Sequence, residues 1–105
     1  MFTAFQVDAP AAGDTPVEVT ADVTIDQPCV CKVISPADEG VAIFVGNSDV
    51  TAGAGFPVPV YTEGSGAVEP LEFRLLPGDQ VYAISNAGTP PGSAPLNVLI
   101  YSAPQ

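Results

Sequence analysis

Apolar and polar residues alternate along the chain in short stretches. Over residues 17–25 every odd-numbered residue is apolar, and every even-numbered residue is acidic or a threonine. A period of two over this length predicts a strand with one face on a core and the other in water. Further short stretches rich in branched and aromatic residues also predict strands, and they are residues 29–35, 41–45, 56–61, 71–76, 81–85 and 96–102.

Twelve prolines and ten glycines lie between and within these stretches, and they leave no room for long helices. The sequence Pro77-Gly78-Asp79 predicts a turn, so we expect residues 71–76 and 81–85 to pair as a hairpin. Pro57 and Pro59 cannot donate backbone hydrogen bonds, so their segment is expected to be an edge strand or an extended arm. Loops are predicted at residues 36–40, 63–69 and 86–95.

About seven strands at a spacing of roughly ten residues predict an all-β fold, namely an antiparallel β-sandwich, with a small β-barrel as the alternative. We expect residues 16–105 to form this single domain, because a chain of 105 residues has room for one core. Residues 1–15 are expected to form an extended N-terminal arm, and the alternative is an eighth strand in the same domain. Aromatic side chains supply much of the energy at interfaces, so Phe2 and Phe5, with Val7 beside them, make the arm a candidate anchor.

The composition indicates a folded chain with an unusually neutral surface. Hydrophobic residues make up 47% of the sequence and charged residues only 13%, which is far from the signature of disorder. Much of the surface must therefore consist of small neutral residues. Such a surface is suited to being buried against other chains, and the alternative is that it is simply an ordinary soluble surface.

The chain is strongly acidic. Twelve Asp and Glu residues stand against one lysine, Lys32, and one arginine, Arg74, for a net charge of -10. Two cations cannot form the basic face that a phosphate backbone or an anionic membrane requires, so we expect neither nucleic acid nor membrane as a partner. No apolar run approaches the roughly 20 residues of a spanning helix, and the N-terminus has no secretory pattern, so synthesis in the cytoplasm is expected.

The residues of common active sites are missing from this sequence. It contains no histidine, which is the usual general base near neutral pH. Cys29 and Cys31 lie two apart in an apolar run, where a bridge between them would be strained and no further soft ligand accompanies them, so we expect buried free thiols. The acidic residues form no distinctive pair. We therefore expect no enzyme, and we assign no catalytic residue, no cofactor and no metal ligand.

Two segments carry a resemblance to a known group of proteins. Residues 41–58 read VAIFVGNSDVTAGAGFPV, and residues 71–85 read LEFRLLPGDQVYAIS. These segments resemble small structural proteins of tailed bacteriophages, which often combine a strand, a Gly-x-Ser-Asp-Val-Thr turn, Gly-Phe-Pro and a later Pro-Gly-Asp before another strand. The similarity covers residues 41–85, and each piece taken singly is common turn chemistry.

The resemblance implies a virion structural protein, most similar to a capsid decoration protein on the outside of the phage head. It implies binding to the major capsid protein and self-association as a homotrimer. The alternative is a receptor- or glycan-binding module of a phage tail or fibre, and a small hydrolase that uses two carboxylates is a more distant alternative. The residues expected to bind partners are Phe2, Phe5 and Val7 in the arm, with Phe56 and Pro57 in the proline-containing segment.

Overall fold

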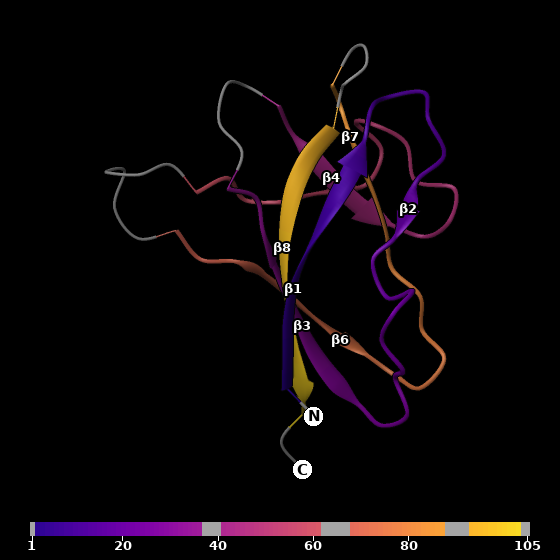
Figure 1. The fold of residues 1–105 in the computed structure, drawn as a ribbon, viewed down its shortest axis with the longest axis vertical. Helices are drawn as coiled ribbons and strands as arrows, with labels where there is room; N and C mark the ends of the chain where they lie inside the picture. The colour runs from indigo at the N-terminus through magenta and orange to yellow at the C-terminus, as the bar shows by residue number, and fades with distance from the viewer. Residues whose placement is uncertain (1, 37–40, 62–67, 88–92, 104–105) are drawn as a thin grey trace.

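The computed structural model describes residues 2–36, 41–61, 68–87 and 93–103. These residues form two antiparallel sheets of four strands each, and they contain no helix that could cross a membrane. The predicted all-β sandwich is confirmed (Figure 1). The strands are β1 (Phe2–Pro10), β2 (Val17–Glu18), β3 (Cys29–Ile34), β4 (Ile43–Gly46), β5 (Phe56–Pro57), β6 (Leu71–Leu75), β7 (Tyr82–Ser85) and β8 (Ser93–Ser102).

The first sheet, which we call sheet A, has the strand order β1-β8-β3-β6. Its longest pairing joins β1 to β8, where Phe2 lies opposite Tyr101 and Pro10 lies opposite Ser93. In Figure 1 these two strands run side by side along the length of the molecule. Residues 2–10 therefore form an eighth strand of the same domain, which was the alternative to a free arm.

The second sheet, sheet B, has the order β2-β7-β4-β5. Its edge strand β5 contains Pro57, opposite Phe44 of β4. A proline at an edge loses no ladder hydrogen bond, because its missing N–H would face away from the sheet. The prediction that this segment forms an edge strand is confirmed.

The core fills the space between the two sheets. Sheet A contributes alternate residues, since successive side chains of a strand point to opposite faces. Cys31, Val33, Leu96 and Ile100 are among its fully buried members. From sheet B and the connecting segments come Val19, Ile25, Ile43, Val45, Val58, Val81 and Ala83.

The prediction of a strand over residues 17–25 is wrong beyond the first two residues, because the strand β2 ends at Glu18. Val19 still donates a backbone hydrogen bond to Val81, but the N–H of Val23 then bonds the carbonyl of Thr20, which closes a turn. The Thr20 side chain is buried, and its hydroxyl oxygen accepts a hydrogen bond from the N–H of Val81. A residue from the expected polar face thus fixes the turn, while Val19 and Ile25 reach the core as the alternation predicts.

The predicted hairpin between residues 71–76 and 81–85 is also wrong. Strand β6 pairs with β3 in sheet A, whereas β7 pairs with β2 and β4 in sheet B. The Pro77-Gly78-Asp79 turn does form, with Gly78 at a φ of 87° and the Asp79 carboxylate accepting a hydrogen bond from the Leu76 N–H. It turns the chain from one sheet to the other and does not join neighbouring strands.

The predicted loops fall largely outside the described residues, at positions 37–40, 62–67 and 88–92. The last of them is shorter than expected, since β8 already begins at Ser93. The buried free cysteines are confirmed, because Cys29 and Cys31 are both buried and form no disulfide.

Candidate functional site

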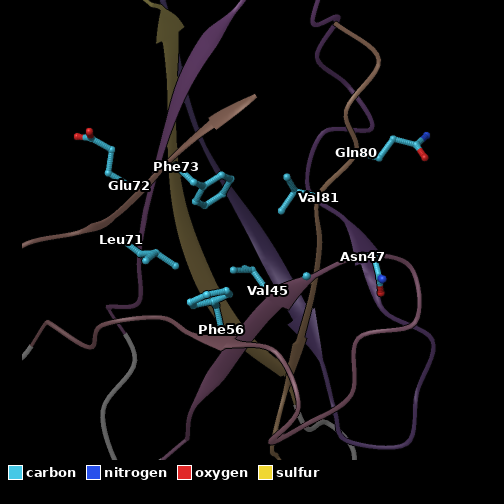
Figure 2. Close-up of a pocket in the computed structure, with 9 residues that line it drawn as sticks. Val45, Asn47, Phe56, Leu71, Glu72, Phe73, Gln80 and Val81 are labelled. Atoms are coloured by element: carbon cyan, nitrogen blue, oxygen red, sulfur yellow. The ribbon is translucent and has the colours of Figure 1, made fainter. Parts of the chain in front are cut away.

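A cleft of about 360 Å³ opens between the edge of sheet A and the edge of sheet B. The edge strand of sheet A here is β6, and that of sheet B is β5. Figure 2 shows the side chains of Phe56, Leu71 and Phe73 pointing toward one another in this cleft, with Val45 and Val81 beside them. Asn47, Glu72 and Gln80 line its rim and point away from its centre.

Phe56 is the most exposed apolar side chain of the cleft. Its ring is at the edge of sheet B, and 72% of the residue is accessible to solvent. Val45, its cross-strand neighbour in β4, is buried, so the backbone of Phe56 is paired to a core strand while its ring stays in water. An exposed aromatic ring on a fixed backbone loses little conformational entropy on binding, and this favours a contact with another molecule.

The outer face of sheet A carries both apolar and charged side chains. One row across this face, from β1 to β6, consists of Phe2, Tyr101, Val30 and Arg74. The next row holds Ala4, Leu99, Lys32 and Glu72. Phe2 ends the first row at the free edge of β1, and it is 75% exposed.

Both cations of the chain lie on this outer face. Lys32 forms an ion pair with Glu72, with 3.5 Å between Nζ and Oε1, and its Nζ lies 5.7 Å from the centre of the Tyr101 ring. The Tyr101 side chain first, and Glu72 after it, raise the pKa of Lys32 above its ordinary value. Lys32 therefore stays charged at neutral pH, and it forms a short charged row with Glu72 on this face.

The residues predicted to bind partners occupy two separate edges of the sandwich. Phe2, Phe5 and Val7 lie on β1, at the end of sheet A opposite to β6, whereas Phe56 and Pro57 lie on β5. Along β1 the burial alternates, so Phe2 points outward while Phe5 and Val7 pack against the core. Phe2, Phe56 and Pro57 are exposed, and Phe5 and Val7 are half-buried.

Leu71 and Phe73 are not among the residues predicted to bind partners, although both line the cleft. Their alternation with Glu72 and Arg74 puts them on one face of the predicted strand, and in the structure this face packs against the core. What the alternation cannot show is that this strand is the last in its sheet, so that its inner face is only partly covered. A strand's position in a sheet depends on pairings between distant segments.

The cysteines are placed for packing and not for chemistry. Cys29 and Cys31 are fully buried in the core between the sheets, and the Cys29 thiol donates a hydrogen bond of 3.2 Å to the Gln27 carbonyl. Burial, with a smaller effect of Cys29, raises the pKa of Cys31 to about 12. A thiol with such a high pKa remains protonated at neutral pH, and it is a poor nucleophile and metal ligand.

Within the described part of the chain, no group of three or more His, Cys, Asp or Glu residues could hold a metal ion together. The arrangement instead offers exposed aromatic side chains, Phe2 and Phe56, at the edges of the sandwich. Surfaces of this kind bind other proteins or apolar groups. No family model, no curated protein and no solved structure matches this chain.

Proposed function

We propose that this chain is a non-enzymatic assembly protein that binds other protein chains through its exposed aromatic residues. One observation carries the proposal: Phe2 and Phe56 each lie on a paired strand, yet they are 75% and 72% exposed. Phenylalanine side chains in a folded domain are usually buried, because each removes a large apolar area from water. Two rings held in solvent by the sheet backbone are more consistent with contact sites than with core residues.

The specific role that we propose is decoration of a phage capsid by binding to the lattice of the major capsid protein. The support for this step is the resemblance of residues 41–58 and 71–85 to phage structural proteins. A two-sheet scaffold with a net charge of -10 would also suit a protein displayed in many copies, because like charges limit unwanted association in solution. Homotrimer formation, which the same resemblance implies, stays a prediction.

The test is co-sedimentation of the purified protein with mature, undecorated phage capsid shells. Deleting residues 1–10 would remove a whole strand of sheet A, so point variants are the better probe. Phe2→Ala and Phe56→Ala each remove one exposed ring, and Leu76→Ala, at a residue that is 57% exposed in the turn after β6, is the matched control. Saturable binding that at least one phenylalanine variant weakens by roughly tenfold or more, with the control unchanged, would support the proposal.

The capsid proposal fails if the wild-type protein does not sediment with shells at any concentration tried. Binding to a panel of bacterial surface glycans or to whole cells would then favour the tail or fibre alternative. Binding to shells that neither phenylalanine variant changes would keep the capsid role but remove Phe2 and Phe56 as its contacts.

A further inference from the structure

The outer edge of β6 is open. This strand is the last in sheet A and pairs only with β3. In the described ranges no backbone hydrogen bond reaches its other side. The neighbouring edge strand β5 is protected by Pro57, whereas Leu71–Leu75 contains no proline. An unprotected edge of this kind is a template for pairing with a further strand.

The ladder fixes which backbone groups of β6 face this open edge. The N–H of Ala103 donates to the carbonyl of Pro28, so Pro28 directs its polar backbone group toward the β8 side of sheet A. Backbone groups alternate in direction along a strand, and Cys29 therefore faces β6. The backbone N–H and C=O groups of Leu75, which lies opposite Cys29, therefore point toward β3. Those of Phe73, which lies opposite Cys31, do the same. The alternation then leaves the N–H and C=O groups of Glu72 and Arg74 pointing away from the sheet.

The sequence of β6 is complementary to itself in the antiparallel direction. It reads Leu-Glu-Phe-Arg-Leu from residue 71 to residue 75. If two copies pair about a two-fold axis at Phe73, each Glu72 lies opposite the second copy's Arg74, and each Leu71 lies opposite the second copy's Leu75. The residues whose backbone groups point outward are thus also the residues whose side chains attract each other. Each Glu72–Arg74 pair would exchange backbone hydrogen bonds and form a cross-strand ion pair.

We propose that two copies of this chain associate through β6, joining their four-stranded sheets into one continuous sheet. The pairing is two-fold and closed, so it yields a dimer with the same surface on both partners. The inference does not rest on the capsid role, because it requires only a second copy of the chain. It also differs from the homotrimer that the resemblance implies.

The distribution of charge favours this edge over other surfaces. Each copy has a net charge of -10, so two copies repel each other over most of their surfaces. The only cations, Lys32 and Arg74, lie on sheet A beside the open edge. Glu72 already pairs with Lys32, and among the described residues the exposed Arg74 makes no ion pair. In the dimer, Glu72 would lie between Lys32 and the second copy's Arg74, forming a row of alternating charge.

The dimer would also cover the cleft. A two-fold axis perpendicular to sheet A leaves sheet B of both copies on the same side, so the two clefts face each other. Phe73, Leu71 and the exposed Phe56 line the cleft at this edge (Figure 2). Pairing through β6 would bring Phe73 next to its counterpart and remove apolar surface of the cleft from water. This burial adds to the backbone hydrogen bonds and ion pairs.

Charge reversal tests the pairing directly. Glu72→Arg places Arg opposite Arg, and Arg74→Glu places Glu opposite Glu, so each variant alone is expected to raise the dimer dissociation constant by about tenfold. An equimolar mixture of the two variants should form heterodimers, because every cross-strand pair is then of opposite charge. The double variant Glu72→Arg/Arg74→Glu should dimerise like the wild-type protein. Analytical ultracentrifugation of the full chain measures all four species.

Two further variants separate pairing from net charge and from folding. Asp22→Arg, at an exposed residue away from β6, changes the net charge by the same amount as Glu72→Arg and should leave the dimer intact. Arg74→Pro removes an N–H that points outward, so it should weaken the dimer while circular dichroism still shows the wild-type sheet content. A monomeric wild-type protein at every concentration reached would overturn the inference. So would single charge reversals that associate as well as the wild type, or a mixture that fails to restore the dimer.

Discussion

The Ser85 hydroxyl donates a hydrogen bond of 2.8 Å to the carbonyl of Pro10, which lies 75 positions away in the sequence. Ser85 ends β7 of sheet B, and Pro10 ends β1 of sheet A. The same hydroxyl oxygen accepts a hydrogen bond of 3.3 Å from the N–H of Ala87. The Ser85 side chain therefore links the two sheets by a hydrogen bond at one end of the sandwich. At the same end, the N–H of Ala12 donates a hydrogen bond to the Ala87 carbonyl.

Ser85→Ala is expected to lower the free energy of unfolding by about 1–3 kcal/mol, because Ser85 is fully buried and its loss leaves polar backbone groups without a partner. Urea denaturation followed by circular dichroism measures the change. Ser48→Ala, at an exposed serine in the turn after β4, is the matched control and should stay within about 0.5 kcal/mol of wild type. Equal effects of the two substitutions would contradict a structural role of this hydrogen bond.

Gly55 allows the loop after β4 to pack closely against its own strand. A Cβ at this position would lie 2.5 Å from Val50 Cγ2 and 2.7 Å from the backbone oxygen of Val45. The backbone oxygen cannot move without disturbing the pairing of β4, so Gly55→Ala is expected to cost about 2–3 kcal/mol of stability. Gly53 has a φ of 86° but open space around it, so Gly53→Ala should cost only about 1 kcal/mol. Thermal unfolding of both variants checks the order, and a larger loss for Gly53→Ala would contradict the packing argument.

The periodicity of the sequence predicted strand locations well because it reflects burial directly. Each predicted strand range overlaps a strand of the structure, and Val19 and Ile25 are buried as their alternation implies. The same periodicity did not distinguish a long strand from a short strand followed by a turn at residues 17–25. That difference depends on the Thr20 hydroxyl reaching Val81, a contact across 61 positions that no local pattern contains.

The candidate site was predicted in part. Exposed aromatic residues at Phe2 and Phe56 follow from their positions near the N-terminus and beside a proline. The cleft does not follow in this way, because it exists only where β6 and β5 are both edge strands. The adjacent turn at Pro77-Gly78-Asp79 suggested a hairpin that would have covered β6, and only the pairing of β6 with β3 alone reveals its open edge.

The stability of the protein should fall at alkaline pH because of Cys31. Burial raises its pKa from 9.0 to about 12, so the folded state retains a proton that the unfolded state loses. Well below pH 9 the thiol is protonated in both states and its contribution is constant. Between about pH 9 and pH 12 the unfolded thiol ionises first, which lowers the free energy of unfolding by about 1 kcal/mol at pH 10.

Urea denaturation at pH 8 and about pH 10 measures this decrease. Cys31→Ala should be less stable than wild type at pH 8, because it leaves a small cavity in the core, but its stability should fall less between the two pH values. The same decrease in both proteins would show that other groups cause the alkaline loss.

Substituting Phe2 and Phe5 should affect stability differently, because Phe2 is a proposed contact residue on the surface and Phe5 is a core residue. Phe2 is 75% exposed on the outward face of β1, so Phe2→Ala should change the free energy of unfolding by less than about 0.5 kcal/mol. Phe5 lies on the opposite face, half-buried and packed against the core, so Phe5→Ala should cost about 2–3 kcal/mol. Urea denaturation of both variants, beside the shell-binding measurement, tests this division. A variant of Phe2 that loses stability as much as the variant of Phe5 would assign Phe2 to the fold, and its weak binding to shells could then no longer be attributed to a lost contact.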